Sequence, residues 1–471
     1  MVFSDINFIL LFLPAVFFFY FSLSRNWSNY VLLFSSFLFY YIGEGVYTFI
    51  LIFIVSFCYS ILKLREKFEK YGNIFIGVGV SVNIFILLLL KYSDFLVENF
   101  NSLLELFSNF KVTAKDFHNP IGISFYVFQA ISLLIDTHRN DKNLKTNFLN
   151  IYLYVSLFPQ LVAGPIVRFK DIVSQFVERH SSQEDLIVGT RRFVVGLSKK
   201  VLVADMLAPT VEGLLNSQQE LSFEQAWFCV FCFSMRVYFD FSGYSDMAIG
   251  LCRIFGFKIK ENFRNPYESF TMQELWSRWH ISLTKWFKDY VFVNLRMALK
   301  KLKINSFYLA ILINFILIGF WHGASWSFFF FGFFHGSVII LERLSKLKRI
   351  TKIYPIFGLL YTQVVWMTLI PFFIINEYRN AFDYVKIMYS FDSFSNLKIF
   401  ISNELKLILS ISIIYSYANS IINSKLRKIL IRKNIIEKSI NIFDVFLIIL
   451  FILTLSRISI NTFNPFIYFQ F

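Results

Sequence analysis

Residues 319–336 read GFWHGASWSFFFFGFFHG, an apolar segment without a single Asp, Glu, Lys or Arg. Uncharged runs of this length are typical of helices embedded in a lipid bilayer. His322 and His335 interrupt the run, and the two ring nitrogens of each imidazole need hydrogen-bond partners in such surroundings. The segment therefore predicts membrane-embedded helix and leaves open whether the histidines serve packing, proton transfer or chemistry.

The composition extends this prediction to the whole chain. Of the 471 residues, 56% are hydrophobic and only 16% are charged, whereas about 25% of the residues in a soluble domain carry a charge. We expect an all-α polytopic membrane protein with about 10 to 12 spans plus interfacial helices, some of them re-entrant or broken because their apolar runs are short. Runs of spanning or nearly spanning length lie near residues 7–23, 29–43, 46–62, 73–90, 120–135, 148–163, 225–239, 306–321, 326–341, 353–375, 405–422 and 443–457.

The basic charge fits a membrane protein better than a nucleic-acid-binding protein. The formal net charge is +15, and basic residues gather in short loops at 63–70, 346–349 and 425–433. This pattern favours positive-inside topology and attraction to the anionic headgroups of the lipid bilayer. No nucleic-acid-binding motif accompanies the charge, so we expect no nucleic-acid partner. The run at 7–23 lacks a preceding cationic segment and a small-residue cleavage site, which predicts a retained first span rather than a signal peptide.

The segment WSRWHISLTKWFKDY at 276–290 predicts one helix with an aromatic face and a cationic face. Thr271 is the candidate N-cap of this region, with Glu274 three residues later. An interfacial position explains the Trp residues and the lysines. It does not explain His280, which falls on the aromatic face.

His322 stands out from an ordinary structural histidine because of its neighbours. Gly323-Ala324-Ser325 follows it directly, and these small residues leave room for a substrate to reach the ring. On one continuous helix His335 would lie roughly 20 Å away. The two histidines therefore share a site only if the chain folds back between them.

Two carboxylates, Asp240 and Asp246, lie in the otherwise apolar segment VYFDFSGYSDMAIG at 237–250. Buried carboxylates in a span usually mark function or a required ion pair. Their spacing of six places them on different faces of a straight helix, so we expect no shared metal site. The four cysteines lie in or beside apolar segments and are interpreted as small buried hydrophobic residues rather than metal ligands.

Six stretches together resemble the membrane-bound O-acyltransferase family, and within it the bacterial alginate O-acetyltransferase subgroup. In chain order they are PIGISFYVFQAIS, FPQLVAGPIVRF, YFDFSGYSDMAIG, ELWSRWHISLTKW, GFWHGASW and the terminal FIYFQF, starting at residue 120. The resemblance implies one polytopic domain over 1–471, a helical bundle that encloses a transmembrane funnel. Its parts would be N-terminal spans at 1–119, a core with the catalytic segments at 120–345 and C-terminal spans at 346–471.

The resemblance also implies which residues act. The family's hallmark histidine, in a Trp-His-Gly setting, matches His322, and a second position in the preceding Trp-rich segment matches His280. His335 has no matching role and keeps a structural interpretation. As candidates for the substrate path we add Trp279, Arg278, Asp240 and Trp321.

The implied activity is O-acyl transfer. A neutral imidazole suits removal of a proton from a hydroxyl, so His322 is expected to act as general base or to accept and relay the acetyl group. His280 would orient the substrate or polarise the thioester carbonyl. The expected donor is cytoplasmic acetyl-CoA, with no bound cofactor, and Arg278, Lys285 and Lys288 would meet either its phosphates or lipid headgroups.

The acceptor is expected outside the membrane. Acetyl groups would cross the bacterial cytoplasmic (inner) membrane to O-acetylate a polysaccharide such as alginate, peptidoglycan or another exopolysaccharide. A separate periplasmic or membrane-anchored O-acetyltransferase partner would complete the transfer. Two alternatives stay open: transfer of D-alanine from a carrier protein to teichoic acid, and a non-enzymatic transporter or channel. The latter predicts internal repeats and lines of ionisable groups, neither of which the sequence shows clearly.

Overall fold

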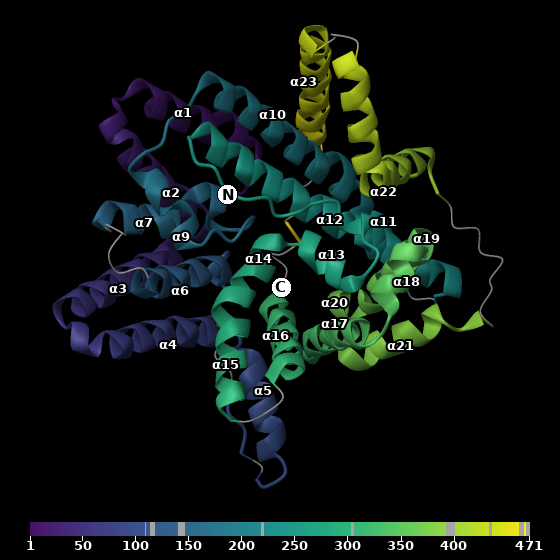
Figure 1. The fold of residues 1–471 in the computed structure, drawn as a ribbon, viewed down its shortest axis with the longest axis horizontal. Coiled ribbons are helices and arrows are strands. Elements are labelled where there is room, and N and C mark those ends of the chain that lie inside the picture. Colours follow the sequence, from purple (N-terminus) through teal and green to yellow (C-terminus); the bar gives the residue numbers. More distant parts are fainter. Residues whose placement is uncertain are drawn as a thin grey trace. The chain divides into compact units, whose positions relative to one another are not determined.

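The computed structural model describes residues 1–108, 110–113, 118–139, 147–217, 221–302, 306–391, 401–432, 436–460 and 466–467, with side chains described outside 419–441. Every regular element within these ranges is a helix (Figure 1), which confirms the predicted all-α class. Of the terminal FIYFQF stretch, only Phe466 and Ile467 lie inside the described residues.

Several helices are long and apolar enough to cross a bilayer, so the chain is a multi-pass membrane protein. By length and composition, the described residues contain five such stretches: Arg25–Lys67, Glu69–Lys91, Trp326–Leu344, Pro355–Ile374 and Ile442–Ile460. Phe8–Ser22 and Ser306–His322 are shorter apolar helices. The expected total of 10 to 12 spans stays a prediction, because helices such as α12 (Phe223–Ile254) are long but carry charged residues within their apolar sequence.

The helices divide into two compact units. Unit 1 comprises residues 1–189 and 248–260. Helices α3 (Thr48–Lys67) and α6 (Ile123–Arg139) both pack closely against α4 (Gly72–Lys91) at Gly79. A Cβ atom on Gly79 would lie 2.8 Å from Leu134 Cδ1 of α6 and 3.2 Å from Ile61 Cγ2 of α3. The elements of unit 1 are α1 (Leu13–Ser22), α2 (Ser28–Glu44), α3 (Thr48–Lys67), α4 (Gly72–Lys91), α5 (Ser93–Leu104), α6 (Ile123–Arg139), α7 (Phe148–Ser156), α8 (Phe158–Leu161) and α9 (Phe169–Ile172).

Unit 2 comprises residues 190–247 and 261–471 and holds every residue predicted to act in catalysis. Helices α10 (Gln183–Lys199) and α12 continue from one unit into the other. The remaining helices of unit 2 are α11 (Asp205–Leu215), α13 (Met272–Arg278), α14 (Ile281–Phe287), α15 (Val293–Lys301), α16 (Ser306–His322), α17 (Trp326–Leu344), α18 (Leu347–Ile353), α19 (Pro355–Leu369), α20 (Pro371–Ile374), α21 (Tyr378–Met388), α22 (Asn403–Arg432) and α23 (Ile436–Ile460).

The stretch 319–336 forms a hairpin rather than one helix. Helix α16 ends at His322, and α17 begins after Ser325, whose side chain accepts a hydrogen bond from the backbone N–H of Phe328. The two helices meet backbone to backbone, since a Cβ atom on Gly319 would lie 2.2 Å from the carbonyl oxygen of Phe328. Gly332 has the same relation to the carbonyl oxygen of Phe315, also at 2.2 Å. The chain thus folds back between the two histidines.

The prediction of one helix over 276–290 is wrong. Helix α13 ends at Arg278, α14 begins at Ile281, and a π-helical turn covers Lys288–Phe292. His280 lies at the break with φ 41° and ψ 54°. Residues other than glycine rarely adopt this left-handed backbone conformation. The predicted start of this region is confirmed, because the Thr271 side chain accepts a hydrogen bond from the backbone N–H of Glu274 (3.1 Å).

Candidate active site

The helix break at His280 is hydrogen-bonded to the irregular segment 262–264. The backbone N–H of Arg264 donates to the carbonyl oxygen of Arg278 (2.9 Å), and the N–H of Ile281 donates to that of Asn262 (2.8 Å). These bonds satisfy backbone groups on both sides of His280 that a continuous helix would pair internally. Left-handed residues other than glycine cost on the order of 1 kcal/mol or more and concentrate at functional sites. The left-handed backbone conformation alone therefore makes His280 a candidate functional residue.

The His280 ring is held in one tautomer by Asn262. The amide oxygen of Asn262 accepts from the backbone N–H of Ser282 (3.2 Å), which can only donate, so this atom is an acceptor. The same oxygen lies 3.1 Å from Nδ1 of His280, which must therefore carry the proton. The Asn262 amide nitrogen donates to Oγ of Ser245 (2.9 Å). The remaining ring nitrogen, Nε2, then bears a lone pair.

That lone pair lies in buried, apolar surroundings. His280 is fully buried, and Nε2 has no hydrogen-bond partner among the residues that the structure describes. His280 lies outside the candidate spans, and its burial lowers the pKa of the imidazole well below the ordinary value. A neutral ring with an available lone pair is a suitable proton acceptor or hydroxyl-binding group.

His322 lies among aromatic rings at the end of α16. Its exposed fraction is 3%, and its ring centroid lies 5.1 Å from that of Phe373 and 5.8 Å from that of Phe331. The ring lines a cavity of about 10 Å³, a volume on the order of one water molecule. The other lining residues are Phe233, Val237, Trp276, Trp279, Phe331, Trp366, Ile370 and Phe373.

Trp321 joins the two predicted catalytic residues. Its indole lies 5.5 Å from the ring of His280 and 4.8 Å from that of His322, measured between centroids. The structure thus brings both histidines to one tryptophan, although 41 positions separate them along the chain. Trp279, another candidate, lines the cavity with His322.

Two other candidates are bound in ion pairs. Arg278 pairs with Glu274 at 2.6 Å and is not among the residues that line the cavity. Asp240 lies 3.0 Å from Nζ of Lys200 and accepts from the backbone N–H of Ile467 (2.8 Å). Their roles on a substrate path stay predictions.

Asp246 follows the same pattern as Asp240. It pairs with Arg192 at 2.9 Å and with Lys199 at 2.7 Å. The two carboxylates therefore belong to separate ion-pair groups. Within the described part of the chain, no three His, Cys, Asp or Glu side chains form a group that could hold a metal ion.

His335 has a local hydrogen bond that explains its presence in α17. Its Nδ1 donates to the carbonyl oxygen of Phe331 (2.8 Å), one turn earlier. The rings of His335 and His322 both contact Phe331, at 4.3 Å and 5.8 Å between centroids. The fold-back of α17 therefore places His335 near the cavity without making it a lining residue.

The sequence patterns did not single out Asn262, Trp276 or Trp366 as candidate site residues. Asn262 belongs to an irregular polar segment, KENFRN, in which no spacing distinguishes one amide from another. Trp276 was assigned to an aromatic face, yet its indole nitrogen is buried with no acceptor among the described residues. Trp366 comes from a plain apolar run near 353–375 and contacts Trp279 at 4.9 Å between ring centroids.

Comparison with known proteins now decides the family. The model of the membrane-bound O-acyltransferase family matches residues 86–352, more than half of the chain and a range that contains Asn262, His280 and His322. The chain belongs to this family. The protein is therefore an O-acyltransferase, as the resemblance predicted.

Individual relatives agree with this assignment. The chain is 34% identical over 374 residues to the probable alginate O-acetylase AlgI of Azotobacter vinelandii, covering 78% of this chain and 74% of that protein. It is 32% identical over 377 residues to the peptidoglycan O-acetyltransferase of Helicobacter pylori, covering 73% and 70%. It is 31% identical over 249 residues to the teichoic acid D-alanyltransferase of Streptococcus thermophilus, covering 50% and 60%.

Proposed function

We propose that this O-acyltransferase moves acetyl groups from a cytoplasmic donor, acetyl-CoA, across the bacterial cytoplasmic membrane to O-acetylate an extracytoplasmic polysaccharide. The observation that carries the proposal is the placement of His280 and His322 on one indole beside a buried cavity. Similarity over about three quarters of the chain to a probable alginate O-acetylase supports acetate as the group that is transferred. The similar peptidoglycan O-acetyltransferase supports a polysaccharide acceptor.

The two histidines take different roles in this proposal. His322 lines the cavity and acts as the general base, or as the group that accepts and relays the acetyl unit. The thioester C–S bond breaks, and coenzyme A leaves as its thiol with the proton taken from the acceptor hydroxyl. Because Nδ1 of His280 carries the proton toward Asn262, its Nε2 cannot donate to a thioester carbonyl. The tautomer thus favours His280 as the group that accepts a hydrogen bond from the acceptor hydroxyl and orients it.

A donor for the developing oxyanion is also needed. Trp276 lines the cavity with His322, and its indole N–H has no acceptor within the described residues. We assign Trp276 this role, in which a buried donor without a partner gains a hydrogen bond as the carbonyl oxygen becomes negative. The cavity of about 10 Å³ admits an acetyl group only after aromatic side chains move, since an acetyl group exceeds one water in volume.

The remaining partners are those that the family resemblance implies. Arg278, Lys285 and Lys288 would meet the phosphates of the donor, and a separate periplasmic or membrane-anchored O-acetyltransferase would complete transfer to the polymer. A second candidate is D-alanyl transfer from a carrier protein, which similarity to a teichoic acid D-alanyltransferase supports over half of the chain. Incubation of the purified protein with labelled acetyl-CoA or with a D-alanyl carrier protein distinguishes the two donors.

The test of the proposal is polymer-bound acetate in cells that carry His322→Ala. We expect loss of ester-linked acetate at a membrane level of protein matched to wild type. His335→Gln is the matched control, because His335 is a buried histidine near the same cavity but does not line it. Unchanged acetylation in His322→Ala would overturn the mechanism. If His322→Ala loses D-alanine esters but keeps its acetate, the protein transfers D-alanine rather than acetyl groups.

A further inference from the structure

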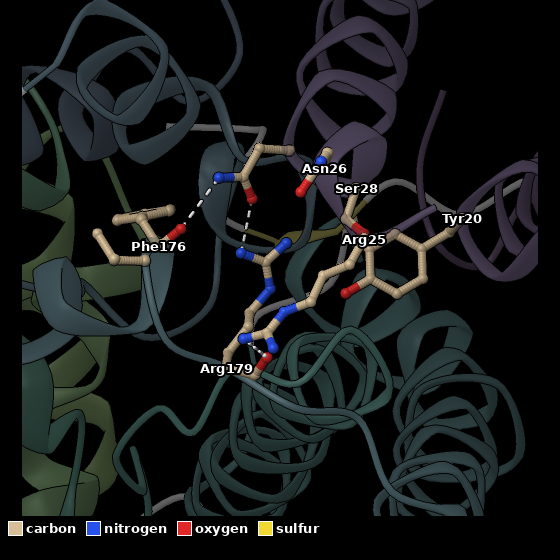
Figure 2. A pocket seen from close by; sticks show the side chains of 8 residues that line it. Tyr20, Arg25, Asn26, Ser28, Phe176 and Arg179 are labelled. Carbon is tan, nitrogen blue, oxygen red and sulfur yellow. Dashed lines mark hydrogen bonds between the residues drawn. The ribbon is translucent and has the colours of Figure 1, made fainter. Parts of the chain in front are cut away.

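Unit 1 contains a polar cavity that includes none of the residues assigned to acyl transfer (Figure 2). Its volume is about 420 Å³, enough for a small anion and several waters. The walls come from the end of α1, the 3-10 turn Arg25–Trp27, the start of α2 and the loop that follows α9. The lining residues are Tyr20, Arg25, Asn26, Ser28, Asn29, Phe176, Val177 and Arg179, none of which is acidic.

Arg179 brings a positive charge to this cavity, and its hydrogen-bond acceptors among the described residues are neutral. Its Nη1 donates to Oδ1 of Asn29 (2.6 Å), and its Nε donates to the carbonyl oxygen of Phe255 (3.1 Å). The guanidinium carbon lies 4.2 Å from the ring centroid of Phe257. Its Nη2 is buried and has no hydrogen-bond partner among the residues described. None of the described residues therefore uses this donor of a charged group, and a ligand in the cavity reaches it once the side chains that cover it move.

Arg25 adds a second positive charge beside the first. Its Nη2 donates to the backbone carbonyl of Arg179 (2.9 Å), and Figure 2 shows the two guanidinium groups close together with the Tyr20 ring alongside. Burial is the main cause that lowers the pKa of Arg179 from its ordinary value; the Tyr20 side chain opposes this effect, and the charge of Arg25 adds to it. Two like charges at short range destabilise each other unless an anion lies with them.

The position of the cavity along the chain indicates a membrane surface. It lies at the junction between the apolar helices Phe8–Ser22 and Arg25–Lys67. Trp27 and Tyr30 beside it are 58% and 53% exposed, as expected for aromatic residues at headgroup level. The junction is also the N-terminus of α2, where the helix dipole favours negative charge.

We propose that this cavity, called here the Arg25–Arg179 cavity, binds a phosphate group. Its ligand is the phosphate of an anionic phospholipid or of a soluble phosphate ester, held by the free donor of Arg179, by the guanidinium of Arg25 and by the amides of Asn26 and Asn29. Guanidinium groups match phosphate oxygens in geometry as well as in charge. The junction between two apolar helices favours the phospholipid.

The test uses the purified full-length protein in neutral detergent. The apparent unfolding temperature is measured with added phosphatidylglycerol, with zwitterionic phosphatidylcholine and with inorganic phosphate. We expect phosphatidylglycerol to raise it for the wild type, and Arg25→Gln to weaken this response at least about tenfold in lipid concentration. Arg25 is exposed and forms one side-chain hydrogen bond, so the variant should fold. Arg349→Gln, which removes an exposed arginine of α18, is the matched control.

Two further variants separate charge from geometry. Arg25→Glu would supply an internal anion to Arg179 and abolish the response to phosphatidylglycerol. Arg179→Lys keeps the charge but removes the donor fork, and should weaken the response. A rise with inorganic phosphate that Arg25→Gln also loses would identify a soluble phosphate ester as the ligand. Equal responses of the wild type, Arg25→Gln and Arg349→Gln to all three additives would overturn the proposal.

Discussion

The amide oxygen of Asn262 lies 3.1 Å from Nδ1 of His280 and fixes the tautomer of that ring. Asn262 is a positioning residue in this arrangement, because it touches the imidazole rather than a substrate. An acceptor at this place keeps the lone pair on Nε2. The ring also contacts Trp321 and Phe241 at 5.5 and 4.5 Å between centroids. Without it either nitrogen could carry the proton.

The first prediction concerns this hydrogen bond. Asn262→Leu should lower acetyl transfer about 10- to 100-fold, since it leaves the buried Nδ1–H of His280 without its acceptor, at a cost of about 1–3 kcal/mol. The rate of acetyl transfer from labelled donor in membranes is the measurement. Ser245→Ala is the control, because it removes only the bond from the Asn262 amide nitrogen (2.9 Å) and leaves the oxygen in place. Equal losses in both variants would contradict a tautomer role.

A second prediction follows from the buried, neutral state of His280. Its pKa is lowered by burial, whereas an unfolded histidine titrates near about 6.5. Between these two values the unfolded chain binds a proton that the native protein does not, so stability falls as the pH drops below about 6.5, by up to about 1.4 kcal/mol per pH unit. The apparent unfolding temperature should therefore fall more steeply with acid in the wild type than in His280→Asn.

Asparagine suits this comparison because it tolerates the left-handed backbone at position 280 better than most residues. Other acid-sensitive groups are common to both proteins and cancel in the difference. Parallel pH profiles for the wild type and His280→Asn would show that the native ring is already protonated at these pH values, contrary to the burial argument.

A third prediction tests the packing behind His280. The Phe466 ring contacts Phe241 and Tyr244 at 5.7 and 4.9 Å between centroids, and the Phe241 ring lies 4.5 Å from that of His280. Phe466→Ala should destabilise the protein by about 3–5 kcal/mol if the void stays open and should reduce acetyl transfer. Phe107→Ala, at an 86% exposed site, is the control. Full activity in Phe466→Ala would show that the packing of Phe466 against Phe241 does not support the position of His280.

A fourth prediction concerns the α16–α17 hairpin. Gly319→Ala would place a Cβ atom 2.2 Å from the carbonyl oxygen of Phe328, so the helices must separate, at about 1–3 kcal/mol or more. Gly77→Ala in α4 has no atom within 4 Å of the new Cβ and should be neutral or stabilising by up to about 1 kcal/mol. Unfolding temperatures in detergent compare the two. A similar response of both positions would mean that the hairpin is not closely packed.

The class of the protein could be predicted from the sequence. The catalytic roles of His280 and His322 stay predictions, and the geometry around them could not be read from local patterns. Apolar runs indicated helices because bilayer-crossing segments need both length and hydrophobicity. The runs at 306–321 and 326–341 correspond to α16 and α17, and Thr271 caps α13 as predicted. These features are local, so local residue patterns suffice to find them.

The helix break at His280 could not be read from the same patterns. The aromatic spacing over 276–290 fits a continuous helix. Backbone hydrogen bonds from Arg264 to Arg278 and from Ile281 to Asn262 instead stabilise a break in the helix between them. Those partners lie 14 positions (Arg264 to Arg278) and 19 positions (Asn262 to Ile281) earlier in the chain. Likewise, the ion pair of Asp240 with Lys200 depends on tertiary contact between different helices. Long-range pairing of this kind leaves no periodic signal.

The glycine contacts between α16 and α17 have a consequence for the choice of acyl group. Separating two backbones that touch directly costs more than moving a side chain, so we expect the cavity to enlarge by movement of lining rings outside the hairpin, such as Trp366 and Phe373. Selection between acetyl and longer acyl chains then depends on how far those two rings can move. A smaller residue at either position should shift the preferred chain length, whereas trimming hairpin side chains that do not line the cavity should change it little.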